Sequence, residues 1–240
     1  MNEERTRITE ENKMAEFADE VLHEAAIGGN TAEVVALLGR GADANARRDD
    51  SRQTPLMGAA EAGHEGVVRR LLEHGAQINA ANKYGETALT LAADGGHTAV
   101  VSALLDWGAD VNVVDEFGDT PLLNAAWGEH EDALRLLLRH RADPNVPNRV
   151  GQTAMTTALA FERRHILTIL LEGGADPDLR HHDQTPLMMA LGDEEAVRLL
   201  LAHGADTSLR DKHGKTALRI ALEDCAHAAV PLLKAVGAKV

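Results

Sequence analysis

The sequence predicts an all-α solenoid, in which short helix–turn–helix units stack one after another and hairpin-like loops join them. Two repeated markers and the composition predict this class. A Thr-Pro/Ala-Leu/Met segment recurs in steps of 33, 33, 33, 32 and 31 residues, beginning at Thr54, Thr87, Thr120, Thr153, Thr185 and Thr216. A Leu pair followed by Gly-Ala-Asp, or a close variant, recurs with it. Only 2% of the residues are aromatic, so Ala, Leu and Gly must do most of the packing.

Each period reads as a helix, a turn, a second helix and an extended loop. The threonine can accept a hydrogen bond from an exposed N–H at the start of the first helix. Ala59 and Ala60 then allow two helices to approach closely, and apolar residues from Val67 to Leu72 follow at helical spacing. Gly75 suits a left-handed helix stop. Because one unit cannot bury its leucines alone, neighbouring units must stack.

Seven copies of the second marker and six of the first predict seven repeats. We place them at about residues 20–53, 54–86, 87–119, 120–152, 153–184, 185–215 and 216–240. Residues 20–240 are expected to form a single repeat domain. Residues 1–19 are polar and acidic, and we expect a leader or a capping helix there.

These segments resemble the ankyrin family, whose period of about 33 residues carries the signature T-P-L-H-x-A. The clearest copies are TPLMGAAEAGHEGVVRRLLEHGAQIN from Thr54 and TALTLAADGGHTAVVSALLDWGADVN from Thr87, and the resemblance covers residues 20–240. It implies an ankyrin-repeat solenoid that binds a protein or peptide partner in its concave groove.

The chain departs from the family pattern at several points. Only His23 keeps the signature histidine, whose loss elsewhere puts the usual hydrogen bonding between loops in doubt. Arg141 replaces a helix-stop glycine, and Asp183 stands where a loop glycine would be. Repeat 6 is two residues short between its helices, and Pro231 falls early in the last helix. We therefore expect the weakest packing in repeats 5–7.

Catalytic and metal signatures are missing from the sequence, which has no G-x-S-x-G, H-E-x-x-H, phosphate loop or G-x-G-x-x-G. We therefore expect no catalytic residue, no metal and no cofactor. Cys225 is the single cysteine and is expected to be structural. His181, His182 and Asp183 resemble a metal site by composition alone, because adjacent residues in an extended tip should point to opposite sides.

Charge and hydropathy argue against two further classes of protein, nucleic-acid-binding proteins and membrane-spanning proteins. The net charge of −14 argues against nucleic-acid binding, which needs a basic surface. There is no run of 18 apolar residues and no apolar signal in MNEERTRITEENKM, so we expect no membrane span and no secretory signal. A single cysteine cannot form an intrachain disulfide, which fits a reducing environment, so we expect a cytoplasmic location.

The resemblance implies that loop tips and the ends of the first helices form the binding face. Exposed aromatic residues are typical interface anchors. Because only 2% of the residues in this chain are aromatic, their presence at exposed positions is informative. The candidate partner-binding residues are Glu61, Tyr84, Glu86, Asp94, Phe117, Asp119, Trp127, Phe161, His181, His182 and His213.

A small-molecule-binding protein or an enzyme remains the alternative. It would use a pocket in the groove of repeats 2–6, where apolar walls and a carboxylate could meet. The residues that could line this pocket are Glu61, Asp94, Asn124, Trp127, Phe161, Met188 and Met189. A closed cavity of several hundred Å³ would favour a ligand, and a broad open trough would favour a protein partner.

Overall fold

The computed structural model describes residues 17–48, 50–224 and 226–240, and within them the fold is all-α, as predicted. Apart from three isolated β-bridges, the regular elements in these ranges are helices. The chain divides into two compact units, Met1–Glu116 and Phe117–Val240. The expected leader lies outside the described residues except for its last three, which begin a helical stretch over 17–27.

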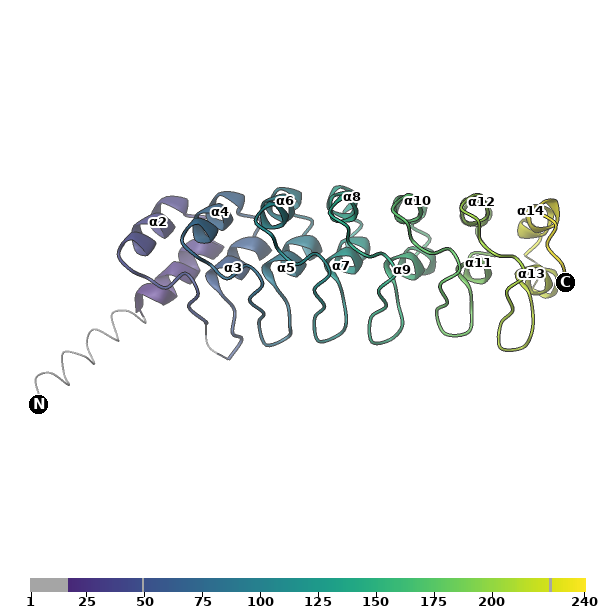
Figure 1. The fold of residues 1–240 in the computed structure, drawn as a ribbon, viewed down its shortest axis with the longest axis horizontal. Helices are drawn as coiled ribbons and strands as arrows, with labels where there is room; N and C mark the ends of the chain where they lie inside the picture. Colours follow the sequence, from purple (N-terminus) through teal and green to yellow (C-terminus); the bar gives the residue numbers. More distant parts are fainter. Residues whose placement is uncertain (1–16, 49, 225) are drawn as a thin grey trace, which may run out of the picture. The chain divides into compact units, whose positions relative to one another are not determined.

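The first unit stacks helices in two layers (Figure 1). After the helical residues 17–27 come α2 (Thr31–Gly39), α3 (Pro55–Glu61), α4 (Glu65–Glu73), α5 (Ala88–Asp94) and α6 (Thr98–Asp106). The first helices α3 and α5 pack side by side, and the second helices α2, α4 and α6 form the other layer. A loop leaves each second helix and leads to the next first helix.

The second unit repeats this arrangement. Its helices are α7 (Pro121–Trp127), α8 (Glu131–Arg139), α9 (Ala154–Ala160), α10 (Arg164–Glu172), α11 (Pro186–Met189), α12 (Glu194–Ala202), α13 (Ala217–Glu223) and α14 (Ala229–Ala235). The first helices α7, α9, α11 and α13 contact one another in sequence, and so do the second helices α8, α10, α12 and α14.

The repeated threonines begin the first helices as the sequence predicts. The hydroxyl of Thr120 accepts a hydrogen bond from the backbone N–H of Leu123 at 3.1 Å, and Thr120 itself is buried. At α5, the slot of the signature histidine holds Thr90, which donates its hydroxyl to the Thr87 carbonyl at 2.8 Å. Local caps therefore satisfy the polar groups at these helix starts.

Neighbouring loops stay connected although most repeats lack the signature histidine. In the first unit, the N–H of Lys83 donates to the Ser51 carbonyl at 3.0 Å, and that of Glu116 donates to the Tyr84 carbonyl at 2.9 Å. His23 adds a bond from its Nε2 to the Gln53 carbonyl, at 2.9 Å. Backbone hydrogen bonds between loops thus replace the histidine elsewhere.

The irregular positions behave in different ways. Arg141 is left-handed, with φ of +68°, which costs roughly 1 kcal/mol relative to glycine. In the short loop before α11, His182 rather than Asp183 takes the left-handed conformation, with φ of +52°. Pro231 is the third residue of α14, so it lies in the first turn, where proline is tolerated. Cys225 lies outside the described residues.

Candidate functional site

The ends of the first helices lie beside the bases of the loops, so both belong to one surface within each unit. In the first unit, Gln53 precedes the α3 cap, and its side-chain amide donates to the Glu61 carboxylate at the end of α3, at 2.8 Å. In the second unit, Lys215 reaches Glu223 at the end of α13 in the same way, at 2.5 Å. We call this surface of loop tips and first-helix ends the loop face.

The candidates of the first unit lie on its loop face, where Glu61, Tyr84 and Asp94 are exposed and Glu86 is partly buried. Tyr84 lies at a loop tip, with the Lys83 ammonium 4.8 Å from its ring centroid. Glu86 accepts a hydrogen bond from the Asn82 side chain at 2.7 Å. Asp94 is the last residue of α5. This part of the loop face combines one aromatic ring with a surplus of carboxylates.

Trp127 and Phe161 meet in the second unit. Trp127 ends α7 and Phe161 follows α9, and their ring centroids are 4.9 Å apart in an edge-to-face arrangement. Their exposed fractions are 36% and 50%, so each residue presents part of its surface to solvent. The expectation that these two aromatic side chains are exposed near helix ends is confirmed.

Arg163 holds this aromatic pair in place, and the sequence interpretation missed it. Its guanidinium donates to the Trp127 carbonyl at 2.6 Å and lies 5.0 Å from the Phe161 ring centroid. His64 and His97 occupy the same slot in earlier repeats, and each reaches the equivalent carbonyl at 2.9 Å. The alignment of Arg163 with these histidines could have revealed its role, because a basic residue at the same position of the repeat can make the same hydrogen bond.

Two glutamates lie beside Arg163 and His165, on the side of the aromatic pair where Arg163 contacts Phe161. Glu129 contacts Arg163 Nε at 3.2 Å and His165 Nε2 at 3.5 Å, and Glu131 lies 3.9 Å from the same histidine nitrogen. Glu129 is left-handed, with φ of +58°, where the earlier repeats have Gly63 and Gly96. An exposed aromatic pair with an acidic rim is therefore the densest group of candidate binding features in this unit.

Phe117 and Asp119 lie on the first loop of the second unit. The Phe117 ring is exposed, and its carbonyl accepts a hydrogen bond from the Arg149 N–H at 2.9 Å. The Asp119 carboxylate accepts one from the Asn148 side chain at 2.8 Å. Asp119 thus connects two neighbouring loops, which is a structural role alongside any contact with a partner.

The histidine tip corrects one expectation. The rings of His181 and His182 lie only 4.2 Å apart, because the left-handed backbone at His182 turns both to the same side. They share a hollow of about 260 Å³ with His213 and the ion pair between Lys212 and Asp183. Within the described residues, no three His, Cys, Asp or Glu side chains are placed to hold a metal ion.

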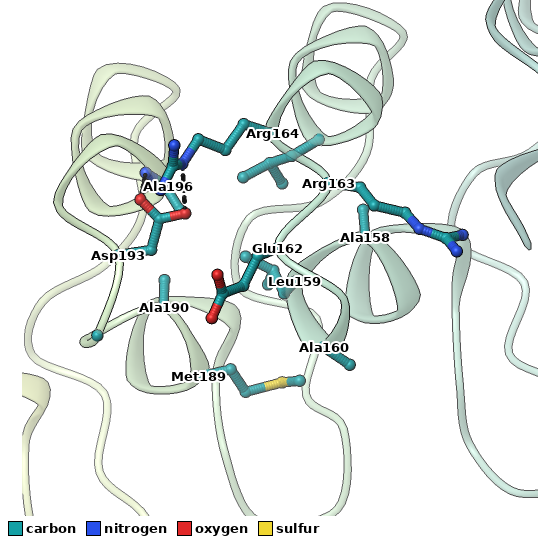
Figure 2. A pocket seen from close by; sticks show the side chains of 12 residues that line it. Ala158, Leu159, Ala160, Glu162, Arg163, Arg164, Met189, Ala190, Asp193 and Ala196 are labelled. Atoms are coloured by element: carbon teal, nitrogen blue, oxygen red, sulfur yellow. Dashed lines mark hydrogen bonds and ion pairs between the residues drawn. The ribbon is translucent and has the colours of Figure 1, made fainter. Parts of the chain in front are cut away.

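The residues of the alternative pocket do not all gather in one place. Met188 and Met189 line a hollow of about 660 Å³ with Ile220 and His227. Trp127 and Phe161 do not line it, and Glu61 and Asp94 belong to the first unit. A smaller cavity of about 200 Å³ lies between α9–α10 and α11–α12 (Figure 2).

An ion pair borders the smaller cavity. Asp193 accepts hydrogen bonds from the N–H groups of Glu195 and Ala196 at the start of α12, and from Arg164 Nε at 2.6 Å. Burial raises the pKa of the Asp193 carboxyl, but these bonds outweigh it and hold the pKa below its ordinary value. The hydrogen bond and charge of Asp193 in turn raise the pKa of Arg164.

Comparisons with known proteins agree with the architecture. The family described as Ankyrin repeats (3 copies) matches residues 22–115, 108–181 and 174–240. A 2-5A-dependent ribonuclease of Mus musculus is 42% identical over 69 residues, which are 29% of this chain and 9% of that protein. In the described part of the chain, no helix has the length and apolar character needed to cross a membrane. The family match extends over nearly the whole sequence, and the chain therefore belongs to the ankyrin-repeat family.

Proposed function

We propose that this protein is a non-catalytic interaction module that binds a protein or peptide partner on its loop face. Ankyrin repeats generally mediate protein–protein interaction, and this chain consists of them almost throughout. The proposal takes residues 20–240 as one repeat domain that acts in the cytoplasm. It assigns partner contacts to the candidate residues on the loop face of both units.

The exposed pair of Trp127 and Phe161 carries the proposal. Tryptophan is among the residues that dominate binding energy at interfaces, where a partner covers its large apolar surface. The edge-to-face contact and Arg163 already fix these rings, so a partner would lose little side-chain entropy on binding them. A pre-organised apolar patch beside loop tips suits a partner that presents an apolar side chain.

The acidic rim narrows the chemistry of the partner. Glu162 directly follows Phe161, and Glu129 and Glu131 lie beside Arg163 and His165. Complementary charge mainly sets orientation and association rate. A partner segment with an apolar anchor flanked by basic residues therefore fits this part of the loop face best.

Affinity capture from the native host, followed by calorimetry with the captured partner, tests the proposal. The double variant Trp127→Ala, Phe161→Ala should weaken binding by about 2 kcal/mol or more, roughly 30-fold. Trp107→Ala is the matched control, because Trp107 is also exposed, at 46%, but follows a second helix. Equal effects of both variants, or no effect of the double variant, would contradict the proposal.

A small ligand in the hollow lined by Met188 and Met189 is the second candidate. Its volume of about 660 Å³ falls in the range of ligand pockets, about 300–1,000 Å³. Native mass spectrometry of the purified protein tests it. A bound small molecule that Met189→Trp displaces would favour this function over the first.

A further inference from the structure

The shortened repeat 6 leaves a cavity beside its first helix. Helix α11 has four residues, whereas α9 has seven, so repeat 6 is shortened in its first helix and not in the turn that follows it. The cavity of about 200 Å³ lies between this turn and the α9–α10 turn (Figure 2). In the first unit, the ring of His97 packs against the equivalent turn, 2.6 Å from where a Gly63 Cβ would be. Repeat 6 has Asp193 before its second helix instead of such a ring.

Apolar and small side chains form the walls of this cavity. Leu159, Leu167 and Met189 supply the larger apolar surfaces, and alanines supply the smaller ones. The charged residues that also line the cavity are Glu162, Arg163, Arg164 and Asp193. The volume is below the range of about 300–1,000 Å³ that is usual for drug-sized ligands. It suits a single side chain of a partner rather than a cofactor.

Glu162 brings a carboxylate to the cavity. It is left-handed, with φ of +55°, at a position where repeats 2 and 3 have Gly63 and Gly96, so its backbone is strained. Its carboxylate points toward Ala190 and Met189 (Figure 2), and all three residues line the cavity.

The cations near Glu162 are engaged with other carboxylates. Arg164 donates to Asp193 at 2.6 Å, and Arg163 turns away from the cavity toward Glu129, at 3.2 Å (Figure 2). Glu162 and Glu195 both act on Arg164 as additional negative charges. Glu162 and Asp193 line the cavity together with Arg163 and Arg164, so the lining carries equal numbers of acidic and basic side chains. Because Arg163 is paired with Glu129 and Arg164 with Asp193, the Glu162 carboxylate is left to complement a cation.

We propose that this cavity, the Glu162 pocket, binds a lysine side chain of the partner, with the ammonium on the Glu162 carboxylate and the methylenes against Leu159 and Met189. Lysine fits better than arginine, because a compact ammonium on an apolar stem matches a single carboxylate over apolar walls. Phe161 directly precedes Glu162, so a peptide that covers the aromatic pair can place a neighbouring lysine in the pocket. The inference rests on the proposed function, of which it specifies the partner.

Methyl NMR with a minimal probe tests the pocket without the partner. The probe is Nα-acetyl-lysine N-methylamide, and the norleucine analogue, which lacks the ammonium, is its control. The lysine probe should shift the Met189 methyl signal saturably, and Glu162→Gln should weaken its binding at least fivefold. Glu65→Gln is the matched control, because Glu65 is a partly exposed glutamate of the first unit that does not line the cavity, and it should leave the affinity unchanged.

Glu162→Gly is the second variant, because glycine suits the left-handed backbone and keeps the protein folded while removing the carboxylate. It should weaken binding as Glu162→Gln does. An unshifted Met189 signal, equal binding of the norleucine analogue, or full affinity in both Glu162 variants would overturn the inference. Such a result would leave the proposed function standing if the double variant Trp127→Ala, Phe161→Ala still weakens binding of the partner. If the lysine probe binds as expected but the double variant does not weaken binding of the partner, the assignment of partner binding to the loop face would be wrong.

Discussion

Arg163 joins two consecutive repeats of the second unit, and its loss should destabilise the protein. The guanidinium donates to the carbonyls of Ala126 and Trp127 at 2.9 and 2.6 Å, and its side chain is only 17% exposed. A hydrogen bond from a charged group contributes about 1.5–3 kcal/mol. The ion pair with the half-exposed Glu129 adds less than about 1 kcal/mol. Because water replaces part of the lost bonding, we expect Arg163→Ala to lower the free energy of unfolding by about 2–3 kcal/mol.

The first unit provides the matched control for this prediction. There His97 performs the task of Arg163, and its ring packs against Gly63 so closely that a Cβ at that glycine would lie 2.6 Å away. Arg163→His alone should therefore collide with the Cβ of Glu129. The double variant Arg163→His, Glu129→Gly recreates the pair of the first unit and should recover most of the lost stability.

Urea denaturation followed by circular dichroism measures these differences. A loss of about 2–3 kcal/mol corresponds to a fall in Tm of about 5–10 °C for a chain of this size. The reasoning fails if Arg163→Ala changes the free energy of unfolding by less than about 0.5 kcal/mol, the range of ordinary surface substitutions. It also fails if the double variant is no more stable than Arg163→His.

Three further outcomes follow from the structure. Arg141→Gly should raise the free energy of unfolding by about 1 kcal/mol, because it relieves a left-handed backbone, and an unchanged urea midpoint would contradict this. The folded-state pKa of Asp193 is depressed, so its stabilisation is present above the unfolded-state pKa and is lost as the pH falls through the folded one. Wild type and Asp193→Asn should thus differ at neutral pH and converge in acid. Amide exchange should be faster after residue 185 than in repeats 2–4, and equal protection would refute a weak C-terminal part.

The sequence predicted best those features that recur at the same position of every repeat. Each cap threonine, such as Thr120, and the left-handed Arg141 followed from alignment of the repeats. Local chemistry decides these features, because a cap or a helix stop depends on residues within one turn. The seven repeat boundaries and the partner-binding residues stay predictions.

Features that depend on two neighbouring repeats were missed. Arg163 contacts carbonyls 36 and 37 residues earlier in the chain, and no local pattern reveals that. The His182 backbone follows from the short loop before α11, and the Glu162 pocket follows from the shortening of α11 itself; the repeat spacing determines neither conformation. The replacement of Gly63 and Gly96 by glutamates in later repeats was visible in the sequence, but its meaning required the neighbouring side chains.

Backbone amide exchange of the protein with and without its captured partner tests the central claim most directly. If the loop face binds the partner, protection should increase at the loop residues 147–152 and at Trp127 and Phe161. The second helices α8 and α10 should exchange as they do in the free protein. Protection confined to those second helices, or no change in the loops at a saturating concentration of partner, would contradict the account.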